Sequence, residues 1–412
     1  MAETIIANLS SLNPFGKGVK YRKTLDSDDV GESLGPDAIA GGGHSARTTH
    51  ITKSQLRISD ALKTFLVSHN VITEAEADQQ YADRSSSLQG LLDLPHINVP
   101  KELTDRKHPL PAYYISSSHN TYLEAHQLVG SSSATAYRTA LTTGSRCVEI
   151  DAWDNDADAE EPKVTHGYTL VSRVSFRSVC EVIRDVYDNE AQEAVDEQGY
   201  RAAPILISLE NHCGAKGQLR LVQIMHEVFG ERLLSKAVRE EGHEEQAGGQ
   251  HVSLAELGSK ICIIVEHHLP NEAEDSDSSS DSSSDDEQKE EYKKEAKKAP
   301  STIIIPELAE LGVYAQSVKP SNNSWFEELS LGPNGPHHHL INVSETGLAR
   351  HFPQHNAKIA HHNAHHLMRV FPKGTRISSR NLNPVPFWAV GAQVAALNWQ
   401  ACFHILSSSR LY

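Results

Sequence analysis

The feature that constrains the fold most is a pattern of short apolar runs and amphipathic helical stretches that breaks once and then resumes. The pattern extends from about residue 112 to 268 and returns after Pro300. Such alternation is typical of β/α units around a parallel sheet. Neither segment alone is long enough for an α/β enzyme, but together they approach the roughly 250 residues of a TIM-type (β/α)8 barrel. We therefore predict one barrel split by an insertion. Two independent α/β domains are the alternative.

The periodicity predicts where the elements of this barrel lie. The expected strands of the first segment are 112–117, 146–151, 163–166, 204–210 and 260–266. Its expected helices are 133–143, 175–188 and 218–234. In the second segment the apolar runs are 311–318, 338–343, 369–371 and 391–399, with a helical stretch at 356–368.

Composition divides the chain into further parts. Residues 271–299 carry eleven acidic residues and five lysines among serine runs, and such a segment cannot bury enough apolar surface to fold. We predict a largely disordered N-terminus (1–50), a small helical module (51–105), the first barrel half (106–270), an acidic linker (271–300) and the second barrel half (301–412). The module looks like a degenerate EF-hand pair, but it has no Asp-x-Asp-x-Asp-Gly loop to bind calcium.

Charge and cysteine usage exclude several classes of protein. The formal charge of −16, from 38 basic and 54 acidic residues, argues against nucleic acid as a partner. The five cysteines lack paired spacing, and the chain shows no apolar leader and no run of eighteen apolar residues. We therefore expect neither a disulfide scaffold, nor a signal peptide, nor a transmembrane segment. The expected location is cytoplasmic.

Three acidic side chains are expected to meet at the carboxyl ends of the strands, where barrel enzymes hold their active sites. Side chains alternate along a strand, so Glu149 and Asp151 share the inward face, and Glu210 ends a later strand in the same way. Ionised acids that converge in a barrel need a counter-charge. With the amide oxygen of Asn120 they form an oxygen set that suits Ca²⁺ or Mg²⁺ better than Zn²⁺, and calcium is the predicted cofactor.

Histidines occur in two different settings. His119 and His166 follow apolar strands at the same rim, and a side chain that titrates near neutral pH suits acid–base work there. The runs at 337–339 and 361–366 suggest a zinc site, but no cysteine or carboxylate lies at ligand spacing. For these runs a polar helix face or loop is favoured.

Taken together, these motifs resemble a known family. The segments that carry the first half of the resemblance are 114–123, 146–153, 164–170 and 204–213. They are similar to the X half of eukaryotic phosphoinositide-specific phospholipase C. The segments 307–318, 367–372, 381–384 and 387–400 resemble its Y half. The resemblance implies calcium-dependent attack of the inositol 2-hydroxyl on its own phosphodiester, which releases diacylglycerol and a cyclic phosphate that water then opens.

The family's site residues carry over by motif position. His119 would stabilise charge on the phosphate, and His166 would protonate the leaving group. The implied calcium ligands are Asn120, Glu149, Asp151 and Glu210. Either Glu149 or Glu210 would be the base for the 2-hydroxyl, and the sequence leaves this open. The implied partner is an inositol phospholipid at a membrane surface, contacted peripherally. No protein activator can be inferred from the sequence.

Recognition of the head group is where this chain departs from the family. Where the family presents two lysines to the ring phosphates, this chain has Ile264 and Glu266. Arg369 matches a phosphate-contacting arginine, Phe371 stands in place of a tyrosine that stacks on the ring, and Asn342 replaces a serine. We expect weaker binding of a bisphosphate and a shift toward phosphatidylinositol or a monophosphate. A register slip that brings in one of the following histidines, 267 or 268, is the alternative.

Two other functions stay open. One is a catalytically silent barrel that binds phosphoinositide as a scaffold, and the other is a phosphodiesterase with altered head-group specificity. The usual lipid-binding accessory domains are not apparent, and residues 401–412 do not resemble the family's ending. From these features we expect a shortened product whose membrane docking depends on the barrel rim or on a partner.

Overall fold

The computed structural model describes residues 60–77, 104–167, 169–193, 195, 199–239, 251–268, 303–319, 324–331 and 335–400. The predicted disordered stretch at 1–50, the acidic linker at 271–300 and residues 401–412 lie outside these ranges. Of the predicted helical module, the structure describes α2 (Asp60–Ser68) and α3 (Glu74–Ala77). None of the helices in the described ranges has the length and apolar character that crossing a membrane requires.

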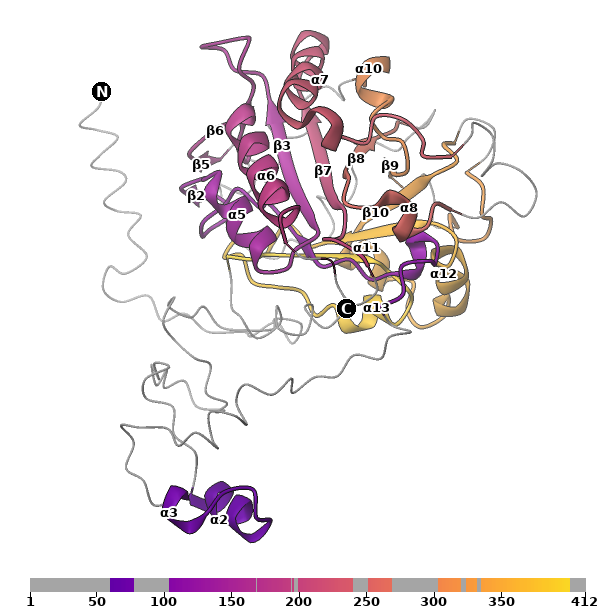
Figure 1. The fold of residues 1–412 in the computed structure, drawn as a ribbon. Helices are drawn as coiled ribbons and strands as arrows, with labels where there is room; N and C mark the ends of the chain where they lie inside the picture. The colour runs from indigo at the N-terminus through magenta and orange to yellow at the C-terminus, as the bar shows by residue number, and fades with distance from the viewer. Residues whose placement is uncertain are drawn as a thin grey trace, which may run out of the picture.

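Eight parallel strands form a closed barrel (Figure 1). The ring consists of β1 (Ser117–Ser118), β3 (Cys147–Trp153), β7 (Ile205–His212), β8 (Ile261–Glu266), β9 (Gln316–Val318), β10 (His339–Ser344), β11 (Leu367–Phe371) and β12 (Val394–Leu397). Each strand pairs in parallel with the next, and β1 closes the ring because it pairs with both β12 and β3. The predicted TIM-type barrel is confirmed.

Two strand pairs join the halves that the acidic linker separates. Val265 of β8 is in register with Gln316 of β9, and Ser117 of β1 with Ala396 of β12. Since both halves contribute to one hydrogen-bonded ring, the alternative of two independent α/β domains is wrong.

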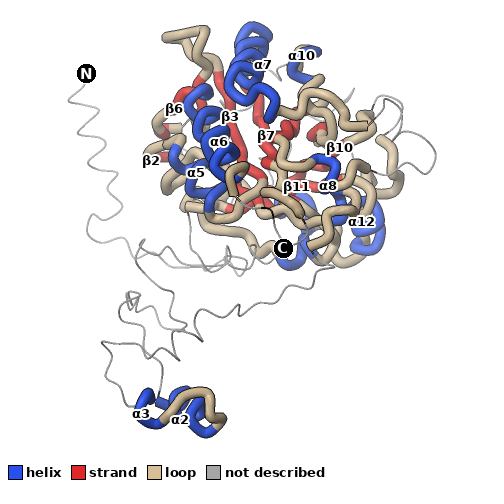
Figure 2. The backbone as a smooth tube through the Cα atoms, viewed as in Figure 1, coloured by secondary structure: helices blue, strands red, loops and turns tan. Residues whose placement is uncertain are grey.

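Helices cover the outside of the ring, as the blue tube around the red strands shows in Figure 2. The longer ones are α5 (Thr135–Thr142), α6 (Phe176–Glu190), α7 (Ala215–Phe229) and α12 (Asn356–Asn363). The short ones are α8 (Leu254–Leu257), α10 (Pro306–Ala309), α11 (Glu345–Ala349), α13 (Val385–Trp388) and the 3₁₀ turns η3 (Leu110–Ala112) and η4 (Gly230–Arg232).

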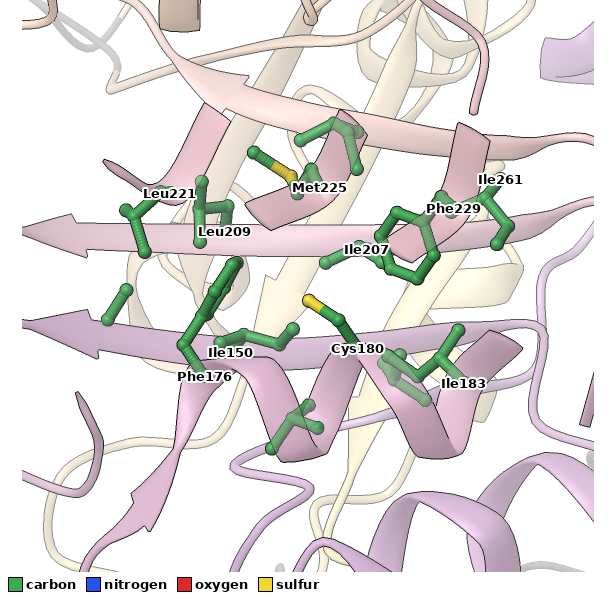
Figure 3. Close-up of a cluster of buried hydrophobic side chains, with 14 of the residues drawn as sticks. Ile150, Phe176, Cys180, Ile183, Ile207, Leu209, Leu221, Met225, Phe229 and Ile261 are labelled. Carbon is green, nitrogen blue, oxygen red and sulfur yellow. The ribbon is translucent and has the colours of Figure 1, made fainter. Parts of the chain in front are cut away.

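Helix α6 shows why the sequence places a helix against this sheet. Ser175 caps its start by accepting a hydrogen bond from the backbone of Ser178. Its buried side chains recur at three- and four-residue steps, from Phe176 through Val179 and Cys180 to Ile183. They pack on outward-facing side chains of the strands, and Figure 3 shows Phe176, Cys180 and Ile183 beside Ile150, Ile207 and Leu209. Each such fully buried side chain contributes about 1.5–3 kcal/mol.

Strand alternation separates this outer layer from the barrel interior. Val148 and Ile150 belong to the outer cluster with α6 and α7, as predicted. Cys147, Leu206 and Ile264 belong to a second apolar cluster that also draws on β10, β11 and β12. This cluster fills the amino-terminal part of the barrel, so the polar residues beyond it lie at the carboxyl end.

Several predicted elements differ from the structure; the apolar run at 311–318, for example, forms a strand only at Gln316–Val318. Residues 163–166 are not a barrel strand, because only β4 (Lys163–Val164) forms and it pairs antiparallel with β3 outside the ring. The first barrel strand is the short β1 rather than 112–117, since Leu110–Ala112 forms η3. The helix expected at 356–368 ends at Asn363, and β11 begins at Leu367.

Three more short strands lie outside the ring. They are β2 (Val129–Gly130), β5 (Leu170–Val171) and β6 (Val174–Ser175). β2 pairs with β5, and β6 pairs with β4. The loops that follow β1 and β3 are therefore tied together on the same side of the barrel mouth.

Candidate active site

Three carboxylates meet at the carboxyl end of β3 and β7. Glu149 and Asp151 lie two residues apart on β3, and Asp151 is in register with Glu210 of β7. One oxygen from each of the three lies within 4.8 Å of the others. Glu149 and Asp151 are buried and Glu210 is exposed, so the cluster reaches from the interior to the surface.

Asp151 is buried next to the two other carboxylates. Burial, and then the nearby Glu210 and Glu149, raise the pKa of Asp151 well above its ordinary value. Tyr122 donates a hydrogen bond of 2.5 Å to Oδ2, but the buried Oδ1 has no hydrogen-bond partner among the described residues. An unmatched buried oxygen costs about 1–3 kcal/mol. This unmet acceptor beside two further carboxylates fits a hard cation that binds oxygen, such as Ca²⁺.

Glu149 has a protein counter-charge. The Arg369 guanidinium donates to its Oε1 at 2.6 Å, and both side chains are almost fully buried. Burial raises the pKa of Glu149, but Arg369 and then His119 lower it by more, so the pKa lies below its ordinary value. The other two residues predicted to bind the head group contact Arg369 itself: Arg369 donates to Asn342 Oδ1 at 3.1 Å, and its guanidinium carbon lies 5.7 Å from the Phe371 ring centre.

The loop after β1 brings His119 and Asn120 to the same place. The His119 backbone donates to Leu397 of β12, which continues the strand pairing. Asn120 adopts a positive φ of 43°, and its backbone N–H donates to Glu149 Oε2 at 2.8 Å. Asparagine tolerates this left-handed conformation better than most residues. Burial is the largest influence on the pKa of His119 and lowers it.

His166 lies in the loop beyond β4, on the same side of the mouth. Burial, and then the adjacent His119, lower the pKa of His166 to about 4, while hydrogen bonding to the Gln127 backbone opposes this. The predicted pair of histidines is thus brought close enough for one ring to affect the other. At neutral pH without substrate, the lowered pKa values keep both rings neutral.

The inner face of β8 carries no cation. Ile264 is in register with Ser208 and packs in the interior cluster, whereas Val265 packs outside. Glu266 therefore faces the mouth, where its Oε2 accepts from the Asn211 backbone at 3.3 Å. Burial and then Glu210 raise the pKa of Glu266. The register of β8 therefore places Glu266, like Ile264, on the inward side of the strand.

Several residues of the site carry no signal in the sequence pattern. Tyr122 reaches Asp151, and Tyr137 of α5 donates to the Glu149 backbone oxygen at 2.7 Å. Gln127 and Asn398 contact Asn120 and His119 respectively. Asn398 lies 279 positions from His119, so no local periodicity could have paired them.

The histidine runs form a separate cluster away from this site, and the expectation of a polar helix face or loop for them is wrong in part. His339 and His362 are buried, while His361 and His365 are exposed. The Nε2 atoms of His339 and His362 lie 3.0 Å apart, and His366 stacks on His339 at 3.8 Å. Neutral imidazoles can hydrogen-bond to one another when buried, because each ring has one donor nitrogen and one acceptor nitrogen. In the described residues, the only cluster with metal-ligand spacing is the carboxylate group.

The fold and the site together define the class: a TIM-type barrel protein that holds two histidines and a carboxylate cluster at the same barrel mouth. The cluster suits a hard cation. Comparison with known families narrows this class. Residues 106–267 match the family described as "Phosphatidylinositol-specific phospholipase C, X domain", and residues 308–406 match the corresponding Y domain. The chain belongs to the phosphatidylinositol-specific phospholipase C family.

Individual relatives agree with this assignment. Over 72% of its length the chain is 36% identical to the mouse protein named 1-phosphatidylinositol 4,5-bisphosphate phosphodiesterase delta-3, and it covers 35% of that protein. Over 71% it is 33% identical to 1-phosphatidylinositol 4,5-bisphosphate phosphodiesterase 1 of Candida albicans, of which it covers 29%. The chain thus spans about a third of the length of these curated relatives.

Solved structures show the same fold. The crystal structure of PLC21 from L. pealei superimposes with a TM-score of 0.60 at 29% identity, covering 100% of this chain and 48% of the other. For PLC21 from S. officinalis the TM-score is 0.59 at 29% identity, with 99% and 47% covered.

Proposed function

We propose that this chain is a calcium-dependent phosphoinositide phospholipase C. It cleaves inositol phospholipids into diacylglycerol and inositol phosphate through a cyclic phosphate, in the cytoplasm and in peripheral contact with a membrane. The observation that carries the proposal is the cluster of Glu149, Asp151 and Glu210 with its unmet buried oxygen, set beside His119 at the mouth of this family's barrel.

Four residues supply the oxygen ligands, namely Asn120, Glu149, Asp151 and Glu210. The chemistry that a calcium ion would supply there is to offset the charge that develops on the phosphate and to lower the pKa of the attacking hydroxyl. Arg369 and Asn120 engage the two oxygens of Glu149 and keep them oriented. Tyr122 fixes the Oδ2 atom of Asp151.

Glu210 is the better candidate for the base that takes the proton of the 2-hydroxyl. Both oxygens of Glu149 already accept hydrogen bonds, and Arg369 holds its pKa low, which weakens it as a base. Glu210 is more exposed, at the surface side of the cluster.

The two histidines act once substrate is present. A phosphodiester anion next to them favours the imidazolium form and raises both pKa values from their lowered positions. His119 then donates a hydrogen bond to the phosphate, and His166 delivers a proton to the departing diacylglycerol oxygen. Because both rings are neutral in the free protein, protonation is coupled to binding.

The charge at the mouth bears on the preferred head group. Glu266 adds a fourth carboxylate beside Glu210, and the buried Arg369 is already paired with Glu149. A ring phosphate next to Glu266 would meet repulsion rather than a cation. We therefore propose phosphatidylinositol or a monophosphate as the preferred lipid, although the relatives are named for the 4,5-bisphosphate.

Release of water-soluble inositol phosphate from mixed vesicles tests the proposal. Release should require calcium and stop on addition of a chelator. His119→Ala should lower kcat by about 10²- to 10⁴-fold, the usual contribution of a positioned proton carrier. Vesicle binding with no release in any condition would favour the silent scaffold. Release from a soluble glycerophosphodiester, and not from vesicles, would favour the other phosphodiesterase.

The same assay tests head-group preference. Turnover of phosphatidylinositol should exceed that of the 4,5-bisphosphate, and Glu266→Gln should narrow the ratio by about tenfold, since one repulsive charge is removed. Glu231→Gln, at an exposed position on η4, is the matched control and should leave the ratio unchanged. Bisphosphate turnover equal to or above that of phosphatidylinositol would refute this preference without affecting the proposed reaction.

A further inference from the structure

A chain of buried amide side chains connects His119 with Asn120. Asn398 Oδ1 lies 2.9 Å from His119 Nδ1, and Gln127 Nε2 donates to the same oxygen at 3.2 Å. Gln127 Oε1 in turn accepts from Asn120 Nδ2 at 2.7 Å. Ser379 also belongs to this hydrogen-bonded series, through Gln127. The exposed fraction is at most 7% for Gln127, Asn398 and Ser379, so water does not compete for these hydrogen bonds.

A backbone carbonyl determines how the side-chain amide of Asn398 is oriented. Its Nδ2 donates to the Arg380 carbonyl at 3.3 Å, and a carbonyl can only accept. The side-chain oxygen of Asn398 must therefore face His119. An oxygen there can only accept, so Nδ1 of His119 carries the proton. This leaves Nε2 as the ring nitrogen available to substrate.

A second backbone carbonyl determines how the side-chain amide of Gln127 is oriented. The Ser379 hydroxyl donates to the Ala125 carbonyl at 2.5 Å, so its lone pairs accept from Gln127 Nε2 at 2.8 Å. Gln127 Oε1 must then face Asn120 and accept from its Nδ2. With the amide nitrogen held by Gln127, the Oδ1 atom of Asn120 turns to the opposite side.

We propose that Asn398 and Gln127 are positioning residues for both parts of the site. Asn398 holds His119 as the Nδ1–H tautomer, and Gln127 orients Asn120 so that its carbonyl oxygen is the atom offered to a cation. This inference rests on the proposed function for its catalytic meaning. The tautomer itself is a property of the free protein and is measured without substrate or metal.

The first test is nitrogen-15 NMR of histidine-labelled protein at pH 8, with the His119 signals assigned by their loss in His119→Ala. Nδ1 of His119 should appear protonated and Nε2 unprotonated, which is the opposite of the tautomer that free histidine prefers. An unprotonated Nδ1 in the wild type would overturn the proposal, and this result needs no variant of Asn398.

Variants of Asn398 separate positioning from mere packing. Asn398→Leu keeps the size but offers no acceptor, so His119 should shift toward the Nε2–H tautomer and kcat should fall by about 10²-fold with little change in KM. Asn398→Asp keeps an acceptor and should retain the Nδ1–H signal and most of kcat. A leucine variant that keeps both the tautomer and kcat would contradict the assignment.

Gln127 is tested through metal binding. Gln127→Met should weaken calcium affinity by about 10- to 100-fold in a calorimetric titration, as loss of a residue that orients a ligand typically does. Asn363→Leu is the matched control, because it removes another buried amide, which bonds to Val390 well away from the carboxylates. It should alter neither calcium affinity nor the His119 tautomer. Unchanged affinity in Gln127→Met would refute its positioning role.

Discussion

Lowering the pH from 7 to 5 is expected to destabilise the protein by several kcal/mol. Burial is the main cause that lowers the pKa of His339 to about 2 and those of His251 and His366 to about 3. The unfolded chain takes up protons at these histidines below about pH 6.5, whereas the folded chain does not. Stability therefore falls as the pH falls, by about 2 kcal/mol per histidine between pH 7 and 5.

Other groups modify this total. Neighbouring rings contribute to the shifts, because His366 and His362 face His339, and His338 faces His251. Asp151 and Glu266 act in the opposite sense, since their raised pKa values let the folded state bind protons that the unfolded state has already released. Three strongly shifted histidines outweigh these two carboxyls, and the sum is large against a typical stability of about 5–15 kcal/mol.

Urea unfolding followed by circular dichroism at several pH values, with chelator present, measures this effect. His366→Phe should reduce the pH slope of the unfolding free energy by about one proton, because one buried titrating ring is removed. His226→Asn, at an exposed position on α7, should leave the slope unchanged. An unfolding free energy that is constant from pH 7 to 5 would show that these buried histidines do not have lowered pKa values in the folded protein.

Arg369→Met should destabilise the metal-free protein by about 3–5 kcal/mol. The substitution leaves Glu149 buried without its counter-charge, and breaking a buried ion pair from one side typically costs this much. The pKa of Glu149 should rise, because Arg369 is the main group that lowers it against burial. Replacing both partners, with Arg369→Met and Glu149→Gln together, should recover most of the loss.

The chain offers a matched control for this change. Arg376 forms a similar buried pair with Glu345 at 2.6 Å. Arg376→Met should be destabilising to a similar degree. Saturating calcium should raise the melting temperature of Arg376→Met by as much as that of the wild type, because its candidate metal site is intact, but should raise that of Arg369→Met by more, because the unpaired Glu149 belongs to that site. A loss below about 1 kcal/mol in Arg369→Met, or equal calcium responses in both variants, would contradict the account.

The parts of this protein that follow from local periodicity could be predicted from its sequence. Alternation along β3 placed Glu149 and Asp151 inside and Ile150 outside, because side chains on a strand alternate whatever the strand pairs with. The same alternation on β8 placed Ile264 in the interior. The split barrel followed from the recurrence of β/α units on both sides of the acidic linker.

The parts that depend on long-range partners could not be predicted in this way. Nothing near Arg369 indicates that it pairs with Glu149, which lies 220 positions away. The polar composition of the histidine runs predicts exposed side chains, whereas the rings of His339 and His362 are buried and hydrogen-bond to one another. At 163–166 the local pattern correctly suggested a strand, but it carries no information on whether the strand joins the ring or, as β4, pairs outside it.

Calorimetric titration of calcium into the lipid-free protein measures whether the carboxylates at the barrel mouth bind the ion. We expect one site, with an affinity that falls by about 100-fold or more in Asp151→Asn. The control is Asp156→Asn, in the exposed loop after the same strand, and it should leave the affinity unchanged. The proposed calcium site would be refuted by a wild-type protein that binds no calcium, or by an Asp151→Asn variant that binds it equally well.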